Sequence, residues 1–250
     1  MIVGNYSKPF SHCTISIERS LALSFMLMLL GGGAARAQQP LEDQLRLKTG
    51  NYWVYAGTVA WSDVTAKNSY SAKKITWKTE ILEEATRGNL KAYRVRGSFA
   101  DLSWYEPEDK PGQYLWIIYQ NRFYSLALNS DLLRRFHDPN DSLVSAVLDE
   151  EPVLQLPLRL NECTTELQPD EPRERDDKLY CWHMEKKQMG KVSARGVAEN
   201  PVTQWIAWYR TMPEHHVLGF APGVGIISYD FSHHGSIYEA HVKLAEAHLQ

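Results

Sequence analysis

The chain has 250 residues, of which 44% are apolar, 11% aromatic and 23% charged, and its formal net charge is -3. This composition excludes a disordered chain, a collagen-like chain and a membrane protein with many spans. Nucleic acid is not an expected partner, because 27 Lys and Arg residues against 30 Asp and Glu residues leave no overall positive field, and no basic cluster is found.

The first 37 residues have the pattern of a secretory signal peptide. An apolar run at 21–30 follows the basic residues Lys8 and Arg19 and precedes small residues that end at Ala37. We therefore expect cleavage near Ala37 and a periplasmic or secreted mature protein. The alternative is a membrane anchor, but the run is well short of the roughly 20 apolar residues that span a bilayer. We expect no transmembrane span in the mature chain.

Cleavage would leave residues 38–250 as one β-rich domain with a net charge near -5 and two of the three cysteines. In an oxidising compartment, the remaining pair, Cys163 and Cys181, predicts a disulfide. It would close an acidic loop at about 164–178. The alternative is two separate buried thiols.

Hydrophobicity in the mature chain varies mainly with a period of two residues, which predicts a mainly β fold. Apolar and polar side chains alternate in most of the expected strands, as they do when one face of a sheet is buried. Gly57, in the middle of the first strand, suggests a bulge or a bend that curves the sheet. The expected strands lie at 52–61, 74–82, 93–99, 114–119, 123–128, 179–187 and 202–210. We predict a curved antiparallel sheet.

A hairpin that turns at His234-Gly235 is expected to end the sheet. The turn and the apolar pattern favour one register, in which the aromatic residues share a face. The expected cross-strand pairs are Phe231 with Tyr238, Tyr229 with Ala240, Ile227 with Val242, Asp230 with Glu239 and Ser228 with His241. The two opposed carboxylates would need a compensating partner.

The middle of the chain predicts one or two short helices. Ser130 is the expected cap of the first, which contains Leu132 and Phe136. Apolar residues recur at helical spacing again at 143–147. Two prolines bracket 153–156, which we interpret as a loop or an edge strand.

All eight tryptophans belong to the mature chain, and these rings suggest an aromatic groove on the concave side of the sheet. Its occupant would be a lipid, another hydrophobic small molecule or an extended peptide. The alternative is that the rings form the core, since strands favour aromatic residues. The candidate groove residues are Trp53, Tyr55, Trp61, Trp77, Trp205, Tyr229 and Tyr238.

Two short motifs resemble those of a group of uncharacterised exported bacterial proteins. Residues 50–55 read G-N-Y-W-V-Y, which is similar to the G-N-x-W-x-Y start of that group, and residues 221–225 read A-P-G-V-G, as its members do near their ends. The resemblance implies an antiparallel sheet like the curved half-barrel of periplasmic lipoprotein carriers. It implies no activity and no catalytic residue.

The late histidines are the candidate metal ligands. Histidines gather late in the chain, close in sequence to the acidic residues Glu214, Asp230 and Glu239, but their spacing matches no established zinc motif. They are His215, His216, His233, His234 and His241, of which the last three are the metal candidates. No nucleophile elbow, P-loop or C-x-x-C is present, so the sequence assigns no catalytic residue and no cofactor. Three hypotheses follow: a non-enzymatic binding or carrier domain, a structural or assembly protein of the envelope, and a metal-dependent hydrolase whose late histidines and acidic residues converge.

Overall fold

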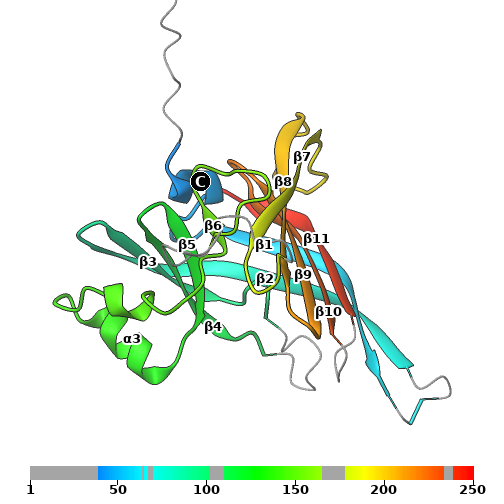
Figure 1. The fold of residues 1–250 in the computed structure, drawn as a ribbon, viewed down its shortest axis with the longest axis horizontal. Helices are drawn as coiled ribbons and strands as arrows, with labels where there is room; N and C mark the ends of the chain where they lie inside the picture. Colours follow the sequence, from blue (N-terminus) through cyan, green and yellow to red (C-terminus); the bar gives the residue numbers. More distant parts are fainter. Residues whose placement is uncertain (1–38, 64, 67–69, 102–109, 165–177, 234–238) are drawn as a thin grey trace, which may run out of the picture. The chain divides into compact units, whose positions relative to one another are not determined.

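Eleven strands form one antiparallel sheet in the computed structural model, which describes residues 39–63, 65–66, 70–101, 110–164, 178–233 and 239–250 (Figure 1). The strands of the first half are β1 (Tyr52–Ser62), β2 (Tyr70–Arg87), β3 (Leu90–Arg96), β4 (Gln113–Tyr119), β5 (Arg122–Ala127) and β6 (Leu154–Gln155). Those of the second half are β7 (His183–Gly190), β8 (Val202–Arg210), β9 (Glu214–Ala221), β10 (Gly225–His233) and β11 (Glu239–His248). The helices of the described residues are α2 (Leu41–Leu45), α3 (Ser130–His137) and a 3-10 helix (Val144–Ala146).

Two meanders make up the sheet, and they join where the first strand pairs with the last. The order is β6-β5-β4-β3-β2-β1-β11-β10-β9-β8-β7, so consecutive strands are adjacent within each meander, and the consecutive strands β6 and β7 lie at the two edges. At the junction, Tyr52 pairs with His248 and Ala60 pairs with Glu239. Joining the two meanders therefore requires contacts between the two ends of the described chain.

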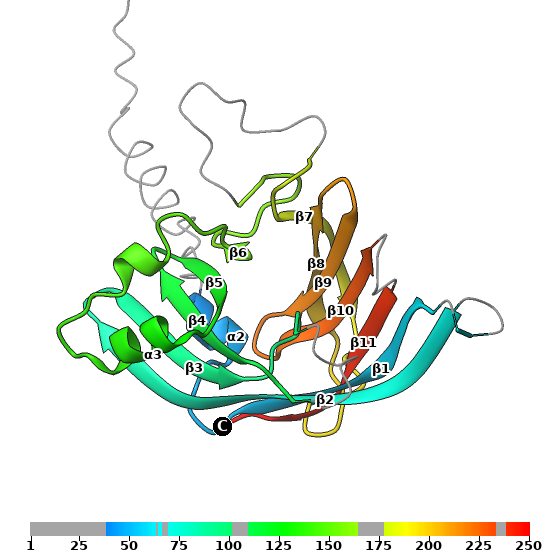
Figure 2. The same cartoon turned by 90° about the horizontal axis from the view of Figure 1, so that it is seen from below.

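The sheet curls into a half-barrel, which confirms the predicted fold class. Figure 2 shows α2 inside the curl and α3 outside it, beside β3, β4 and β5. We call the face that carries α2 the inner face. Alternation along each strand sends one set of side chains to this face and the other set to the outer face.

The inner core is built on aromatic side chains of β1 and β10. Trp53, Tyr55 and Tyr229 are among its largest fully or nearly fully buried residues. Trp53 Nε1 donates to the carbonyl oxygen of Val224 at 2.8 Å, and the Tyr55 hydroxyl donates to that of Ile226 at 2.9 Å. These two bonds satisfy the polar atoms that burial would otherwise leave unpaired.

A smaller core lies on the outer face of β3, β4 and β5, under α3. Phe136 of α3 packs there with Leu143 and Val147 against buried residues such as Leu115. The helix begins at Ser130, but its cap is Asn129, whose side chain accepts from the Leu132 amide, so the expected cap at Ser130 is wrong by one residue. The 3-10 helix falls where a second helical segment was predicted, and the edge strand β6 falls where a loop or an edge strand was predicted.

The register of the last hairpin differs from the prediction by two residues. Tyr229 pairs with Val242, and Phe231 pairs with Ala240. A shift of two keeps every side chain on its predicted face. It also places Asp230 opposite His241 in place of Glu239, so the expected clash of carboxylates is avoided. Tyr238 and His234-Gly235 lie outside the described residues.

One further expectation needs correction, and two elements were not predicted. The irregularity between β1 and β11 lies at Val54/Tyr55 and not at Gly57, where instead the two backbones approach closely: a Cβ there would lie 1.8 Å from the carbonyl oxygen of His241. Strand β9 was missed because Pro213 and the paired histidines that follow it suggest a turn. The helix α2 was missed because five residues carry too little periodicity.

The predicted disulfide between Cys163 and Cys181 is present. It holds the segment around Thr164 against the start of β7, where the Thr164 amide donates to the carbonyl oxygen of Trp182 at 2.8 Å. Among the described residues, no helix has both the length and the apolar character needed to cross a membrane.

Candidate functional site

One histidine of the inner face lies among four aromatic rings. His216 is two and four residues from the buried residues Leu218 and Phe220 of β9. It therefore lies on the same face of the strand as they do, and its side chain points inward. Its ring lies 4.9 Å from Phe231, 5.5 Å from Tyr209, 6.0 Å from Tyr229 and 6.1 Å from Trp182, measured between centroids. We call these five residues, with Glu214 and His233, the His216 cluster.

Polar contacts connect this cluster from the core to the surface. Nδ1 of His216 lies 2.8 Å from the hydroxyl of the fully buried Tyr229. Its other nitrogen, Nε2, lies 3.5 Å from Glu214, whose second oxygen lies 3.9 Å from Nε2 of His233. The imidazole therefore stands between a buried phenol and a partly exposed carboxylate.

Burial decides the protonation states of His216 and Tyr229. It lowers the pKa of His216, while Glu214 acts in the opposite direction and the neighbouring His215 and His233 lower the pKa further. Burial also raises the pKa of Tyr229. At neutral pH the phenol therefore donates to Nδ1, and the proton of the neutral imidazole sits on Nε2, facing Glu214.

A row of apolar residues crosses the inner face through this cluster. The strand registers place Tyr209, His216, Phe231, Ala240 and Val59 beside one another on β8, β9, β10, β11 and β1. Five strands at about 4.8 Å spacing make this row about 20 Å long. Val59 and Phe231 are buried in the row, whereas Tyr209 is partly exposed at its end.

The candidate groove residues divide into two sets. Trp53, Tyr55, Trp77 and Tyr229 are buried and belong to the inner core. Trp61 and Trp205 pack against that core but are partly exposed. Trp61 lies one step along β1 from the apolar row, whereas Trp205 lies near the other end of β8, with Lys187 Nζ 4.9 Å from its ring. Tyr238 lies outside the described residues.

The candidate metal ligands lie on different faces. His233 stacks on Phe231 at the inner face, at 6.2 Å between ring centroids. His241 lies on the outer face, where its Nδ1 is 2.8 Å from Asp230 and its Nε2 is 3.5 Å from Glu239. His234 is not described. Across the residues that the structure places, no group of three or more His, Cys, Asp or Glu side chains is arranged to hold a metal ion.

Sequence reasoning missed Trp182, Tyr209 and His216 as neighbours. Tyr209 and Trp182 could be placed on strands, but nothing local pairs them with His216, which is 34 residues from Trp182 in the numbering. The alternation of His216, Leu218 and Phe220 was the one available signal. It indicates a strand with His216 on its buried face.

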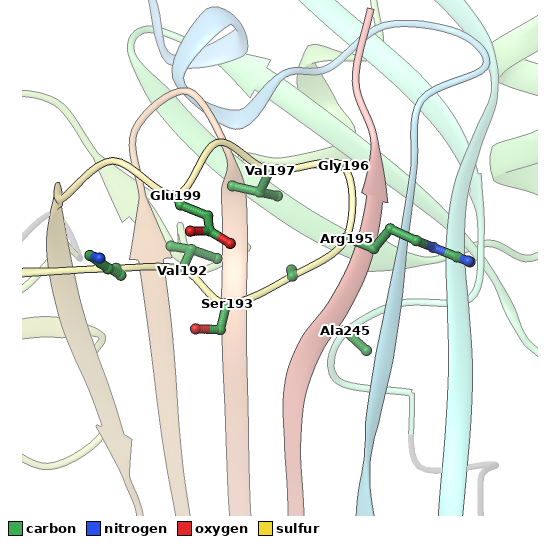
Figure 3. A pocket seen from close by; sticks show the side chains of 9 residues that line it. Val192, Ser193, Arg195, Gly196, Val197, Glu199 and Ala245 are labelled. Carbon is green, nitrogen blue, oxygen red and sulfur yellow. The ribbon is translucent and has the colours of Figure 1, made fainter.

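A more polar cleft of about 590 Å³ lies at the segment between β7 and β8. Figure 3 shows Val192, Val197 and Glu199 within the bend of this segment, while Arg195 extends away from it. Arg195 pairs with Glu246, which also accepts a hydrogen bond from Tyr52.

The described chain thus belongs to the class of single-sheet antiparallel half-barrels with an aromatic inner face. Comparison with models of known protein families yields no match, and comparison with curated proteins yields none.

Two solved structures resemble it. One is a candidate lipoprotein of Parabacteroides distasonis, 10% identical over 80% of this chain and 96% of that chain, with a TM-score of 0.35. The other is a candidate exported protein of Bacteroides fragilis described as having a YmcC-like fold, 8% identical over the same shares, with a TM-score of 0.36. We draw no argument from either similarity.

Proposed function

We propose that this protein is an exported, non-enzymatic binding protein for an apolar or amphiphilic ligand. The observation that carries the proposal is the row of apolar residues on the inner face, with the partly exposed ring of Tyr209 at one end and that of Trp61 beside the other end. Rings of this kind offer a large apolar contact area while their polar atoms reach water or a ligand head group. A row about 20 Å long suits an extended chain, such as an acyl chain, better than a compact molecule.

Export is supported by two independent features. The pattern of the first 37 residues is typical of a signal peptide. A disulfide between Cys163 and Cys181 is expected to persist in an oxidising compartment such as the periplasm. Purification from the periplasm is therefore the natural starting point for a binding experiment.

The experiment measures ligand carried by the protein and ligand bound by it. Native mass spectrometry of protein purified from the periplasm should show a co-purified lipid, and a fluorescent fatty acid should bind saturably. Trp61→Ala and Tyr209→Ala should each weaken binding of the probe at least about threefold, because each removes a partly exposed ring at or beside an end of the row. Leu148→Ala is the matched control, since Leu148 is 68% exposed and packs in neither core.

Two results would overturn the proposal. One is the absence of both co-purified lipid and saturable probe binding. The other is probe binding that the Leu148 variant weakens as much as the two ring variants, since that would show non-specific adsorption. Circular dichroism of each variant separates loss of binding from loss of fold.

A further inference from the structure

The strand β7 stands at one end of the sheet and has a free edge. It pairs with β8 on one side, and on the other side the segment around Thr164 covers only its beginning, where the Asn161 amide donates to the carbonyl oxygen of Met184 at 2.8 Å. Along 186–190, no described residue forms a backbone hydrogen bond with the side away from β8. Every second amide of this stretch therefore points its N–H group away from the sheet.

Positive charge is concentrated on the free edge of β7. Residues 186–198 hold three lysines and one arginine and no aspartate or glutamate, although the whole chain has a formal net charge of -3. The arginine, Arg195, is already paired with a carboxylate. Lys186, Lys187 and Lys191 are exposed, and they form no ion pair with any residue that the structure describes. The edge therefore keeps a net positive charge.

The two carboxylates that flank this stretch in sequence do not neutralise it. Oε2 of Glu185 lies 3.0 Å from Nε2 of His183 and 3.8 Å from Nζ of Lys178, so its charge is directed to the start of β7. Glu199 forms no ion pair with any described residue, and it leaves three unpaired lysines against one carboxylate.

Apolar groups accompany the lysines on this edge. Met189 is 66% exposed. Lys187 lies opposite Trp205 on the inner face, and its Nζ is 4.9 Å from the centroid of the partly exposed indole ring. Lys186 precedes it and points to the outer face. Ammonium groups therefore stand on both faces of the sheet, beside an exposed thioether and a partly exposed indole.

Lysines on an edge strand also prevent the edge from pairing with another sheet. That role accounts for Lys186 and Lys187, but it requires neither the exposed Met189 nor the third lysine, Lys191, beyond the end of the strand. An added peptide strand would lie along the backbone, whereas a planar anionic surface contacts lysines of both faces at once. The arrangement favours a membrane surface over a peptide.

We propose that the free edge of β7 is a docking surface for a bilayer of anionic phospholipids. Phosphate oxygens of the lipids would accept hydrogen bonds from the lysine ammonium groups and from the free amides of the edge. Met189 would enter the head-group region, where tryptophan side chains such as that of Trp205 are also favoured. The proposal does not rest on ligand binding by the apolar row.

The direct test is flotation of the purified protein with phosphatidylcholine vesicles that contain or lack phosphatidylglycerol. The protein should float with the anionic vesicles and not with phosphatidylcholine alone. High salt should release it, because salt screens the lysines from the lipid phosphates. The absence of binding, or equal binding to both kinds of vesicle, overturns the proposal.

Variants of exposed residues locate the surface. Lys186→Gln/Lys187→Gln should weaken binding to the anionic vesicles at least about tenfold, because each lysine near the surface adds to the attraction. Lys74→Gln/Lys243→Gln is the matched control, since it makes the same change of charge at two exposed lysines of other strands and should have little effect. Met189→Ser should weaken binding about threefold, because it removes the apolar group. An equal loss in both double variants overturns the proposal.

Sodium polyglutamate serves as the probe for an acidic peptide partner. If it binds to the edge and the anionic vesicles do not, the surface takes an acidic peptide and the proposal is wrong. Binding of the fluorescent fatty acid should be the same in Lys186→Gln/Lys187→Gln as in the parent protein. Failure of vesicle binding therefore leaves the proposed function untouched, and failure of fatty-acid binding leaves the docking surface untouched.

Discussion

The hydroxyl of Tyr229 lies 2.8 Å from Nδ1 of His216, so a fully buried phenol on β10 meets a partly exposed imidazole on β9. No other described group forms a hydrogen bond with this phenol. The contact therefore connects the inner core to the charged groups at the surface. It can be tested by substituting Tyr229 or Glu214, the two neighbours of His216.

Changing the two neighbours of His216 should move its pKa in opposite directions. Tyr229→Phe removes the donor that stabilises the neutral imidazole, so the pKa of His216 should rise. Glu214→Gln removes the carboxylate that stabilises the charged form, so the pKa should fall. The measurement is an NMR titration of the His216 ring protons. Shifts of the same sign in both variants would contradict the assigned proton positions.

Acid should destabilise the protein partly through His216. Burial lowers the folded-state pKa of His216 below the value of about 6.5 expected in the unfolded chain. The unfolded state therefore binds this proton more readily, and stability is lost as the pH falls from about 6.5 through the folded-state pKa.

Urea unfolding at several pH values between 7.5 and 5.5 measures this loss. The decline should be smaller in His216→Gln than in the parent protein. His215→Gln, which changes the exposed neighbouring histidine on the other face, is the comparison: it removes only the smaller lowering effect of His215 on the His216 pKa, so it should change the decline less than His216→Gln does. Equal declines in all three proteins would exclude His216 as the source.

Removing the disulfide should lower the free energy of unfolding. Cys163 and Cys181 are 18 residues apart, and closing a loop of this size stabilises by about 3 kcal/mol in the chain-entropy model. The double variant Cys163→Ser/Cys181→Ser should therefore unfold at a lower urea concentration than the oxidised parent. The parent treated with a reducing agent should match the double variant. If the reduced and oxidised proteins unfold together, the bridge does not contribute.

Gly57→Ala should destabilise the junction of β1 with β11. The new Cβ would lie 1.8 Å from the carbonyl oxygen of His241, and relief requires the two backbones to separate. We expect a loss of about 3 kcal/mol or more. Gly88→Ala is the comparison, since no atom lies within 4 Å there and only its φ of +61° adds strain, worth about 1 kcal/mol. Thermal unfolding of both variants measures the difference.

Local pattern determined the elements of this fold well. The strand expected at 202–210 is β8 within the same bounds, and that expected at 114–119 is β4 less one residue. Both predictions succeeded because the alternation of apolar and polar residues shows which side chains of a strand are buried. This pattern can be recognised without knowing the partner strand. The same rule kept Tyr229 and Phe231 on their predicted face when the register of the hairpin proved different.

Tertiary structure decided what the aromatic residues do. Trp53 and Trp61 are alike in sequence terms, since both lie on the inward-facing side of β1, yet one is buried under the curl of the sheet and the other is partly exposed. The His216 cluster takes its rings from β8, β9, β10 and the residues before β7, and the two halves of the sheet join through the pairing of β1 with β11. Contacts of this kind leave no trace in a short window of sequence, because they depend on the curvature and register of the whole sheet.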